Sequence, residues 1–364
     1  MIPVTKPYLP DRKTLDKYLD GIYEREWLTN NGQLVQELTA RLEEYLGVEN
    51  LLLVANGTLA LQIAYRALGV SGFEYQEQPE AITTPFTFIA TASSLKWDGV
   101  QPVFADIDPN TWCIDPDNIE KAVTSNTKAI VPVHVFGNAC DVEAIDEIAR
   151  RHQLKVIYDA SHAFGVKYKG KSLLENGDAS TLSFHATKLF HTGEGGAIVF
   201  KRKEDLESAR KMINFGITGP ETIDEIGINA KMNEFQAALG LSVLDEFEAN
   251  ISGRKKVWDY YDKIDAPNFI QQSVMATLEK NYSYYPLLLP SENQVKKLQK
   301  YLSSKNILAR RYFYPSLNSL DWLSKKEKTP VADDVAQRMI CLPIYAGCDC
   351  EAVSELLRNY INEN

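Results

Sequence analysis

Three short motifs carry side chains that can do chemistry, and each directly follows an apolar run of the chain. The first is Asn56-Gly57-Thr58, which stands between an apolar run and a helix-like stretch. A helix N-terminus presents free N–H groups, so a glycine and a hydroxyl at this point can hold a phosphate. The same residues also suit a plain strand-to-helix turn with its cap.

The second motif places a carboxylate and an imidazole at the end of a strand. Asp159 follows the apolar residues 156–158, and His162 comes three positions later. The carboxyl ends of strands in an open α/β sheet form the edge where ligands bind. The alternative is that Asp159 caps a following helix and His162 is a turn histidine.

The third motif contains a lysine near the end of another strand. Ser183 and Lys188 are followed by the glycine-dense residues 193–196. A lysine in this position can be partly desolvated and act as a nucleophile, and the glycines admit a bound group close to the backbone. The alternative is an ordinary lysine in solvent.

A phosphate cradle, a strand-end acid and a reactive lysine, in this order, are what pyridoxal 5′-phosphate requires. Lys188 would bind its aldehyde as an imine. The carboxylate of Asp159 would keep the pyridine nitrogen protonated, so that the ring accepts electrons. The three motifs together therefore predict an enzyme that uses this cofactor.

The elements that position these motifs form a repeating pattern. Seven apolar runs alternate with helix-like stretches, which is typical of βαβ units and a mostly parallel sheet. The runs are residues 51–55, 81–84, 101–104, 129–133, 155–158, 181–184 and 197–200. We predict an α/β fold in which a seven-stranded sheet lies between helices.

The pattern changes after a helical stretch at residues 233–249. Strands are predicted over 282–289 and 307–314, and helices from 290 and over 332–340 and 350–361. This is typical of a smaller α+β domain. We predict a large cofactor-binding domain at residues 1–245, with an N-terminal arm at 1–20, and a small C-terminal domain at 246–364.

Composition narrows the classes of partner. The 364 residues include 39 Lys and Arg against 49 Asp and Glu, a net charge of −10, which disfavours nucleic acid and anionic membranes. Five scattered cysteines favour reduced thiols, and neither a signal peptide nor a membrane span is expected. We predict a cytoplasmic protein. His134, His152, His185 and His191 form no metal-ligand pattern, so no metal is expected and these side chains are interpreted as structural or solvated.

The ordered motifs resemble the DegT/DnrJ/EryC1/StrS sugar-nucleotide aminotransferase family, which has the aspartate-aminotransferase-like fold type I of pyridoxal phosphate enzymes. The resemblance covers nearly the whole chain, at residues 2–7, 56–58, 84–91, 133–137, 159–165, 183–188, 193–197 and 227–238. It implies that Lys188 forms the Schiff base, that Asp159 pairs with the pyridine nitrogen and that His162 lies beside the ring hydroxyl. Phe88 would stack on the ring.

The resemblance also assigns the phosphate and the subunit organisation. Gly57, Thr58 and Ser183 would hold the phosphate in one subunit, and Asn229 would reach it from the neighbouring subunit of a homodimer. Many relatives carry arginine where this chain has Lys231, a point charge without the bidentate fork. Candidate contacts to the sugar nucleotide are Lys6, Trp27, Arg310, Arg311 and Tyr314.

The implied reaction is transfer of an amino group from L-glutamate to a nucleotide-linked keto sugar. Retention of Lys188 favours transamination, because the sugar dehydratases of the family have histidine there. Residues 227–234 resemble enzymes that aminate C4, which favours dTDP-4-keto-6-deoxy-D-glucose as the substrate, for O-antigen synthesis. The alternatives are amination at C3, a UDP-linked substrate, an aminotransferase of ordinary amino acids and a non-catalytic regulatory protein.

Overall fold

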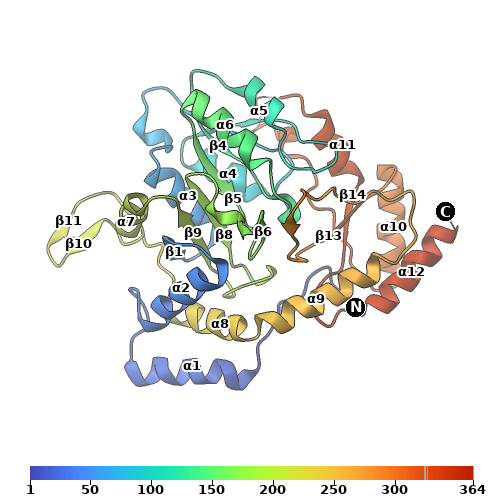
Figure 1. Cartoon of the computed structure of the whole chain (residues 1–364), viewed down its shortest axis with the longest axis horizontal. Coiled ribbons are helices and arrows are strands. Elements are labelled where there is room, and N and C mark those ends of the chain that lie inside the picture. The colour runs from blue at the N-terminus through green and yellow to red at the C-terminus, as the bar shows by residue number, and fades with distance from the viewer. Residues whose placement is uncertain (324, 326, 364) are drawn as a thin grey trace.

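The computed structural model describes residues 1–323, 325 and 327–363 and is built around one seven-stranded sheet (Figure 1). Its order is β1-β9-β8-β5-β4-β2-β3. The strands are β1 (Leu51–Val54), β2 (Glu80–Thr83), β3 (Gln101–Phe104), β4 (Thr127–Val131), β5 (Lys155–Asp159), β8 (Ala179–Ser183) and β9 (Gly196–Phe200). Only β9 runs antiparallel to its neighbours. All seven apolar runs are thus strands of this sheet, and the predicted α/β fold is confirmed.

Helices cover both faces of the sheet. They are α1 (Arg12–Arg25), α2 (Gln33–Leu46), α3 (Gly57–Ala67), α4 (Ile89–Trp97), α5 (Pro116–Ala122), α6 (Val142–His152), α7 (Lys203–Met212) and α8 (Glu234–Asp245). Because side chains alternate along a strand, Leu51 and Leu53 join one buried cluster with α2, α6 and α8. Leu52 and Val54 join another with α3 and α7. The prediction of a sheet between helices is therefore confirmed.

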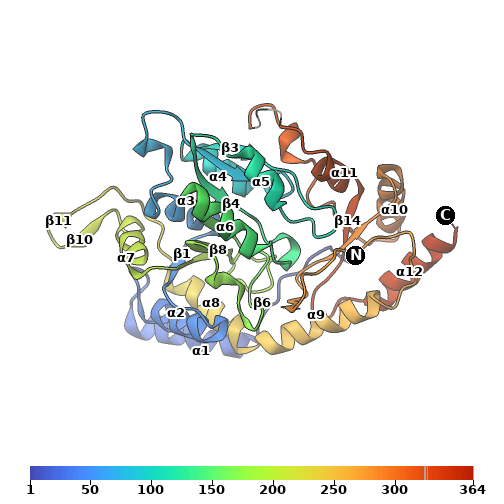
Figure 2. The same ribbon diagram turned by 45° about the horizontal axis from the view of Figure 1, so that its top comes forward.

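The C-terminal part of the chain has its own buried cluster. This part of the chain contains α9 (Phe247–Tyr261), β13 (Tyr285–Leu288), α10 (Glu292–Ser304), α11 (Pro330–Arg338), β14 (Met339–Leu342) and α12 (Cys350–Glu363), of which α11 packs on the large core. Strands β13 and β14 pair antiparallel. Phe247 packs in the large core, whereas Val257 and Tyr261 pack in the C-terminal cluster, so α9 bridges the two, as Figure 2 shows. The domain boundary after residue 245 stays a prediction.

Short strands complete the chain. They are β6 (Lys167–Tyr168), β7 (Lys171–Ser172), β10 (Ile217–Gly219), β11 (Thr222–Ile223) and β12 (Leu278–Glu279). The first residues run beside the C-terminal part, since Ile2 bridges to Ile307 and the Val4 carbonyl accepts the Ile344 N–H at 3.2 Å. Within the described residues, no helix has the length and apolar character that crossing a membrane requires.

Two predictions for the C-terminal part need correction. The strand predicted over 307–314 is wrong: the chain makes only isolated bridges at Ile307 and Arg310 and then turns, because Phe313 packs inward at 5.7 Å from Phe86. The helix predicted over 332–340 ends at Arg338, since the buried residues Met339–Leu342 pair with β13.

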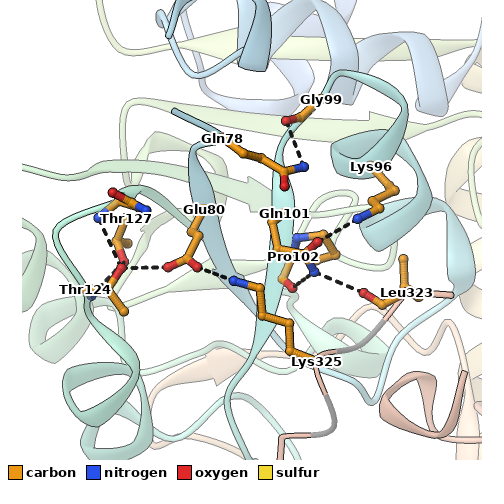
Figure 3. A network of polar contacts seen from close by, with 11 residues as sticks. Gln78, Glu80, Lys96, Gly99, Gln101, Pro102, Thr124, Thr127, Leu323 and Lys325 are labelled. Atoms are coloured by element: carbon orange, nitrogen blue, oxygen red, sulfur yellow. Dashed lines mark hydrogen bonds and ion pairs between the residues drawn. The ribbon is translucent and has the colours of Figure 1, made fainter. Parts of the chain in front are cut away.

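Part of the segment between Phe313 and α11 lies against the N-terminal ends of β2 and β3 (Figure 3). The ammonium of Lys325 lies 2.5 Å from a carboxylate oxygen of the buried Glu80. The Gln101 amide donates to the Leu323 carbonyl at 3.2 Å. Asp106 accepts the N–H groups of Val331 and Ala332, which open α11, at 2.9 and 2.8 Å. These contacts fasten the returning chain to the large core.

Helices α2 and α8 are joined by a buried carboxylate. Glu234, the first residue of α8, accepts the N–H groups of Leu34 and Val35 at 3.0 Å each. The N-cap of α2 is Gly32, and a Cβ there would lie 2.5 Å from the Glu234 carboxyl carbon. Glu234 thus caps α2 from a distant part of the sequence.

We predict that Glu234→Gln lowers the free energy of unfolding by about 1–3 kcal/mol, because the new NH₂ would face a backbone N–H in a buried site. Urea denaturation measures the change. The control is Glu44→Gln on the exposed face of α2, expected within about 0.5 kcal/mol of wild type. Equal stability of Glu234→Gln and wild type would contradict the prediction.

Candidate active site

One cavity of about 780 Å³ lies at the carboxyl ends of β5 and β8. The predicted site residues that line it are Gly57, Thr58, Phe88, Asp159, His162, Ser183, Lys188 and Arg310. The three motifs, which are far apart in the sequence, therefore meet in one place. This is the edge at which parallel α/β sheets bind ligands.

The turn after β1 is packed tightly against the end of β8. A Cβ on Gly57 would lie 2.8 Å from the Ser183 Cβ, so only glycine fits. Asn56 caps α3 by accepting the Leu59 N–H at 2.9 Å, and the exposed Thr58 lies in the first helical turn. The N–H groups at the start of α3 and the hydroxyls of Thr58 and Ser183 together fit a phosphate.

Asp159 is buried and held by two hydrogen bonds. One carboxylate oxygen accepts the Thr91 hydroxyl at 2.7 Å, and the other accepts the Ser161 N–H at 3.1 Å. Thr87 lies 2.9 Å from the Thr91 hydroxyl and extends this chain. No helix follows Asp159 in the described segment 160–166, which turns instead, so the helix-cap alternative does not apply.

His162 is buried among aromatic rings. Its Nδ1 accepts the Phe136 N–H at 3.2 Å, and its ring lies parallel to that of Phe313 at 5.6 Å. Burial, and then the charge of Lys188, hold the pKa of His162 well below its ordinary value. The imidazole is therefore neutral with its proton on Nε2, and it can donate one hydrogen bond.

Lys188 is half-buried in the loop after β8. Its Nζ lies 3.5 Å from the hydroxyl of Tyr284. Burial lowers the pKa of Lys188 to about 8, although the negative charge of Asp159 acts in the opposite direction. A much larger fraction of this amine is therefore neutral and nucleophilic near pH 7 than for a solvated lysine.

Phe88 and Arg310 form other parts of the wall. Phe88 is the N-cap of α4 and is 52% exposed, which leaves its ring free to contact a ligand. The guanidinium of Arg310 lies 4.6 Å from the centre of the Tyr312 ring. Arg310 thus places a positive charge in the cavity.

The structure does not bring the other predicted residues to this cavity. Asn229 and Lys231 line a separate cavity of about 520 Å³, where Lys231 donates to Asn214 at 2.8 Å. Four of the candidate sugar-nucleotide contacts lie outside the main cavity: Lys6, Trp27, Arg311 and Tyr314. Lys6 is exposed, and the indole of Trp27 donates to the Thr29 carbonyl. Arg311 and Tyr314 pack on each other. Arg311 is also paired with Glu292 at 3.1 Å.

Several residues that line the cavity or bond to a residue in its wall were missed in the sequence. Thr91 lies at the end of a motif that carries the family resemblance and could have been found there. Tyr284, Tyr312 and Phe313 come from the C-terminal part and carry no local signal. His185 was interpreted as structural or solvated, but it lines the cavity, with Nδ1 2.8 Å from the Thr187 hydroxyl.

Comparison with known proteins assigns the family. A model of the DegT/DnrJ/EryC1/StrS aminotransferase family matches residues 11–359. This chain belongs to that family. Its members are aminotransferases that depend on pyridoxal 5′-phosphate, so the predictions of enzyme class and cofactor are confirmed.

Individual relatives cover almost the whole chain. A Shigella dysenteriae dTDP-4-amino-4,6-dideoxy-D-glucose transaminase is 44% identical over 94% of both chains. An Escherichia coli protein of the same name is 38% identical over 98% of this chain and 97% of its own. The solved structure of DesI, crystallised in the presence of its TDP-sugar product, has a TM-score of 0.91 and 32% identity, covering 99% of this chain and 93% of that chain. The aminotransferase fold is thereby confirmed.

The lowered pKa of Lys188 predicts how the cofactor-free protein takes up pyridoxal 5′-phosphate. Only the neutral amine attacks the aldehyde, so the rate constant of capture is expected to rise with pH and level off above about 8. Stopped-flow absorbance measures it, with Lys188→Ala as the variant that captures nothing. A midpoint near 10, as for a solvated lysine, would contradict the burial argument.

Proposed function

We propose that this chain transfers an amino group from L-glutamate to C4 of dTDP-4-keto-6-deoxy-D-glucose, giving dTDP-4-amino-4,6-dideoxy-D-glucose and 2-oxoglutarate. The observation that carries the proposal is the meeting of Lys188, Asp159 and the Gly57 turn on one cavity. The names of the Shigella and Escherichia coli relatives support the sugar nucleotide. We further propose a cytoplasmic enzyme of O-antigen synthesis.

The residues present fit pyridoxal 5′-phosphate. Thr58, Ser183 and the first turn of α3 would hold its phosphate, and Gly57 lets this turn pack directly against Ser183. The buried carboxylate of Asp159 would pair with the ring nitrogen, and the neutral His162 would donate to the ring oxygen. When bound, the cofactor supplies an electrophilic carbon and a ring that accepts electrons.

Lys188 moves the proton in this proposal. In the donor half of the reaction, its Nζ takes the proton from the α-carbon of glutamate. In the acceptor half, the same atom delivers a proton to C4 of the sugar. Thr91 fixes the carboxylate of Asp159, so the negative charge stays in one place during both halves. Arg310 offers a partner for the carboxylate or diphosphate of the substrates.

We also propose a homodimer in which each site takes residues from both subunits. Asn229 and Lys231 line a cavity apart from the Lys188 cavity of their own chain. This separation supports a role toward the neighbouring subunit, where Asn229 would reach the cofactor phosphate. Within one chain, residues 1–245 would carry the cofactor, and residues 246–364 would add Arg310.

The reaction is tested by incubating the protein with pyridoxal 5′-phosphate, glutamate and the dTDP keto sugar, followed by NMR of the product. We expect an amino group at C4, no product with Lys188→Ala, and full activity for the exposed control Lys203→Ala. Amination at C3, turnover of only UDP-linked sugars, or turnover by Lys188→Ala would contradict the proposal.

The shared site is tested with mixed dimers that carry two affinity tags. In a dimer of Lys188→Ala with Asn229→Ala, one site receives the intact Lys188 from one subunit and the intact Asn229 from the other. We therefore expect about half of the wild-type activity per dimer, although both parent homodimers are impaired. If Asn229 acts within its own chain, the mixed dimer will be no more active than half of the Asn229→Ala parent.

A further inference from the structure

The amine of Lys188 has a partner from the C-terminal part of the chain. Tyr284 directly precedes β13, and its hydroxyl lies 3.5 Å from Lys188 Nζ. Among the described residues this is the one side-chain hydrogen bond that Nζ makes. The residue lines the main cavity, so its hydroxyl lies beside the atom that would move the proton.

Neighbouring rings fix the direction of this hydroxyl. The Tyr284 ring lies 4.6 Å from that of His162, 5.3 Å from that of Phe136 and 5.5 Å from that of Tyr312, which meets it edge-on. The side chain is buried. A ring held on several sides does not swing away, so the oxygen stays at Lys188 without an entropy cost during the reaction.

The hydroxyl also stays uncharged. Burial raises the pKa of Tyr284, and the nearby Cys341 and Asp159 act in the same direction, whereas Arg254 and Arg310 oppose them. The groups that face Lys188 itself are Asp159 and His162. Tyr284 therefore offers the amine a neutral oxygen rather than a second negative charge.

We propose that Tyr284 is a positioning residue for Lys188. Its oxygen accepts one N–H of the amine, which directs the single lone pair of the neutral Nζ into the cavity toward the substrate carbon. This inference rests on the proposed function, in which Lys188 moves the proton. The chemistry needs no further group: the tyrosine keeps its own proton and only orients the amine.

The test compares Tyr284→Phe with the matched control Tyr285→Phe. The first variant keeps the ring and removes only the oxygen at Lys188. The control removes a buried hydroxyl from the next residue, which bonds Asp262 at 3.0 Å and Gln271 at 2.8 Å, outside the main cavity. A purely structural tyrosine would change stability in both variants and nothing else.

The first measurement is the pH dependence of pyridoxal 5′-phosphate capture by the cofactor-free protein. Tyr284→Phe is expected to lower the midpoint by about half a unit or more, because the charged amine loses a hydrogen-bond acceptor. Tyr285→Phe is expected to leave it unchanged. An unchanged midpoint in Tyr284→Phe would overturn the contact between Tyr284 and Lys188.

The second measurement is steady-state kinetics with glutamate and with glutamate deuterated at the α-carbon. For Tyr284→Phe we expect kcat to fall about ten-fold or more, with both KM values within about two-fold and a larger isotope effect, because the proton transfer slows. A kcat within about two-fold of wild type and an unchanged isotope effect would overturn the positioning role.

The two proposals fail in distinguishable ways. If the wild-type protein does not aminate the sugar nucleotide, the proposed function is wrong. The capture measurement uses only the cofactor, so it still decides whether Tyr284 holds the amine of Lys188. An equal fall in kcat in both variants, together with an equal loss of stability, would assign Tyr284 a structural role and overturn the inference.

Discussion

The site depends on keeping one amine partly out of water. Burial disfavours the charged form of Lys188, and the neighbouring carboxylate of Asp159 favours it, yet burial is the larger effect. The carboxylate can be this close because Thr91 and the Ser161 N–H already bond its oxygens. A buried acid with satisfied hydrogen bonds and a partly desolvated amine can therefore coexist in one cavity.

The sheet brings these groups together through its strand order. β5 and β8 are parallel neighbours with Asp159 opposite Thr181, so Asp159 and Ser183 emerge at the same edge. β1 is separated from β8 by the antiparallel β9. The turn after β1 reaches Ser183 by passing over Gly196, where a Cβ would lie 2.7 Å from the Asn56 backbone. Two glycines, Gly57 and Gly196, thus let the turn after β1 pack against Ser183 at the end of β8.

The sequence predicts the large sheet and the first cavity residues well, because these signals are local. Buried parallel strands appear as continuous apolar runs, and Asp159 and Ser183 end two of them. The C-terminal contributions depend on a path that no local pattern describes. Of the adjacent pair Arg310 and Arg311, the first lines the cavity and the second pairs with Glu292. Residues 307–314 do not form the predicted strand, so the alternation of side chains along a strand could not show which of the two arginines faces the cavity.

That irregular path is itself held in place from both sides. Before the turn, Arg310 bonds the backbone of Cys341 in β14. After it, Gln101 binds the Leu323 carbonyl and Asp106 caps α11, which fastens the chain to the edge of the large core. The loop that carries Arg310 and Phe313, whose ring lies parallel to that of His162, therefore cannot shift without breaking hydrogen bonds. Such fixed placement favours a site whose charges are oriented before substrate arrives, which is where electrostatic stabilisation is most effective.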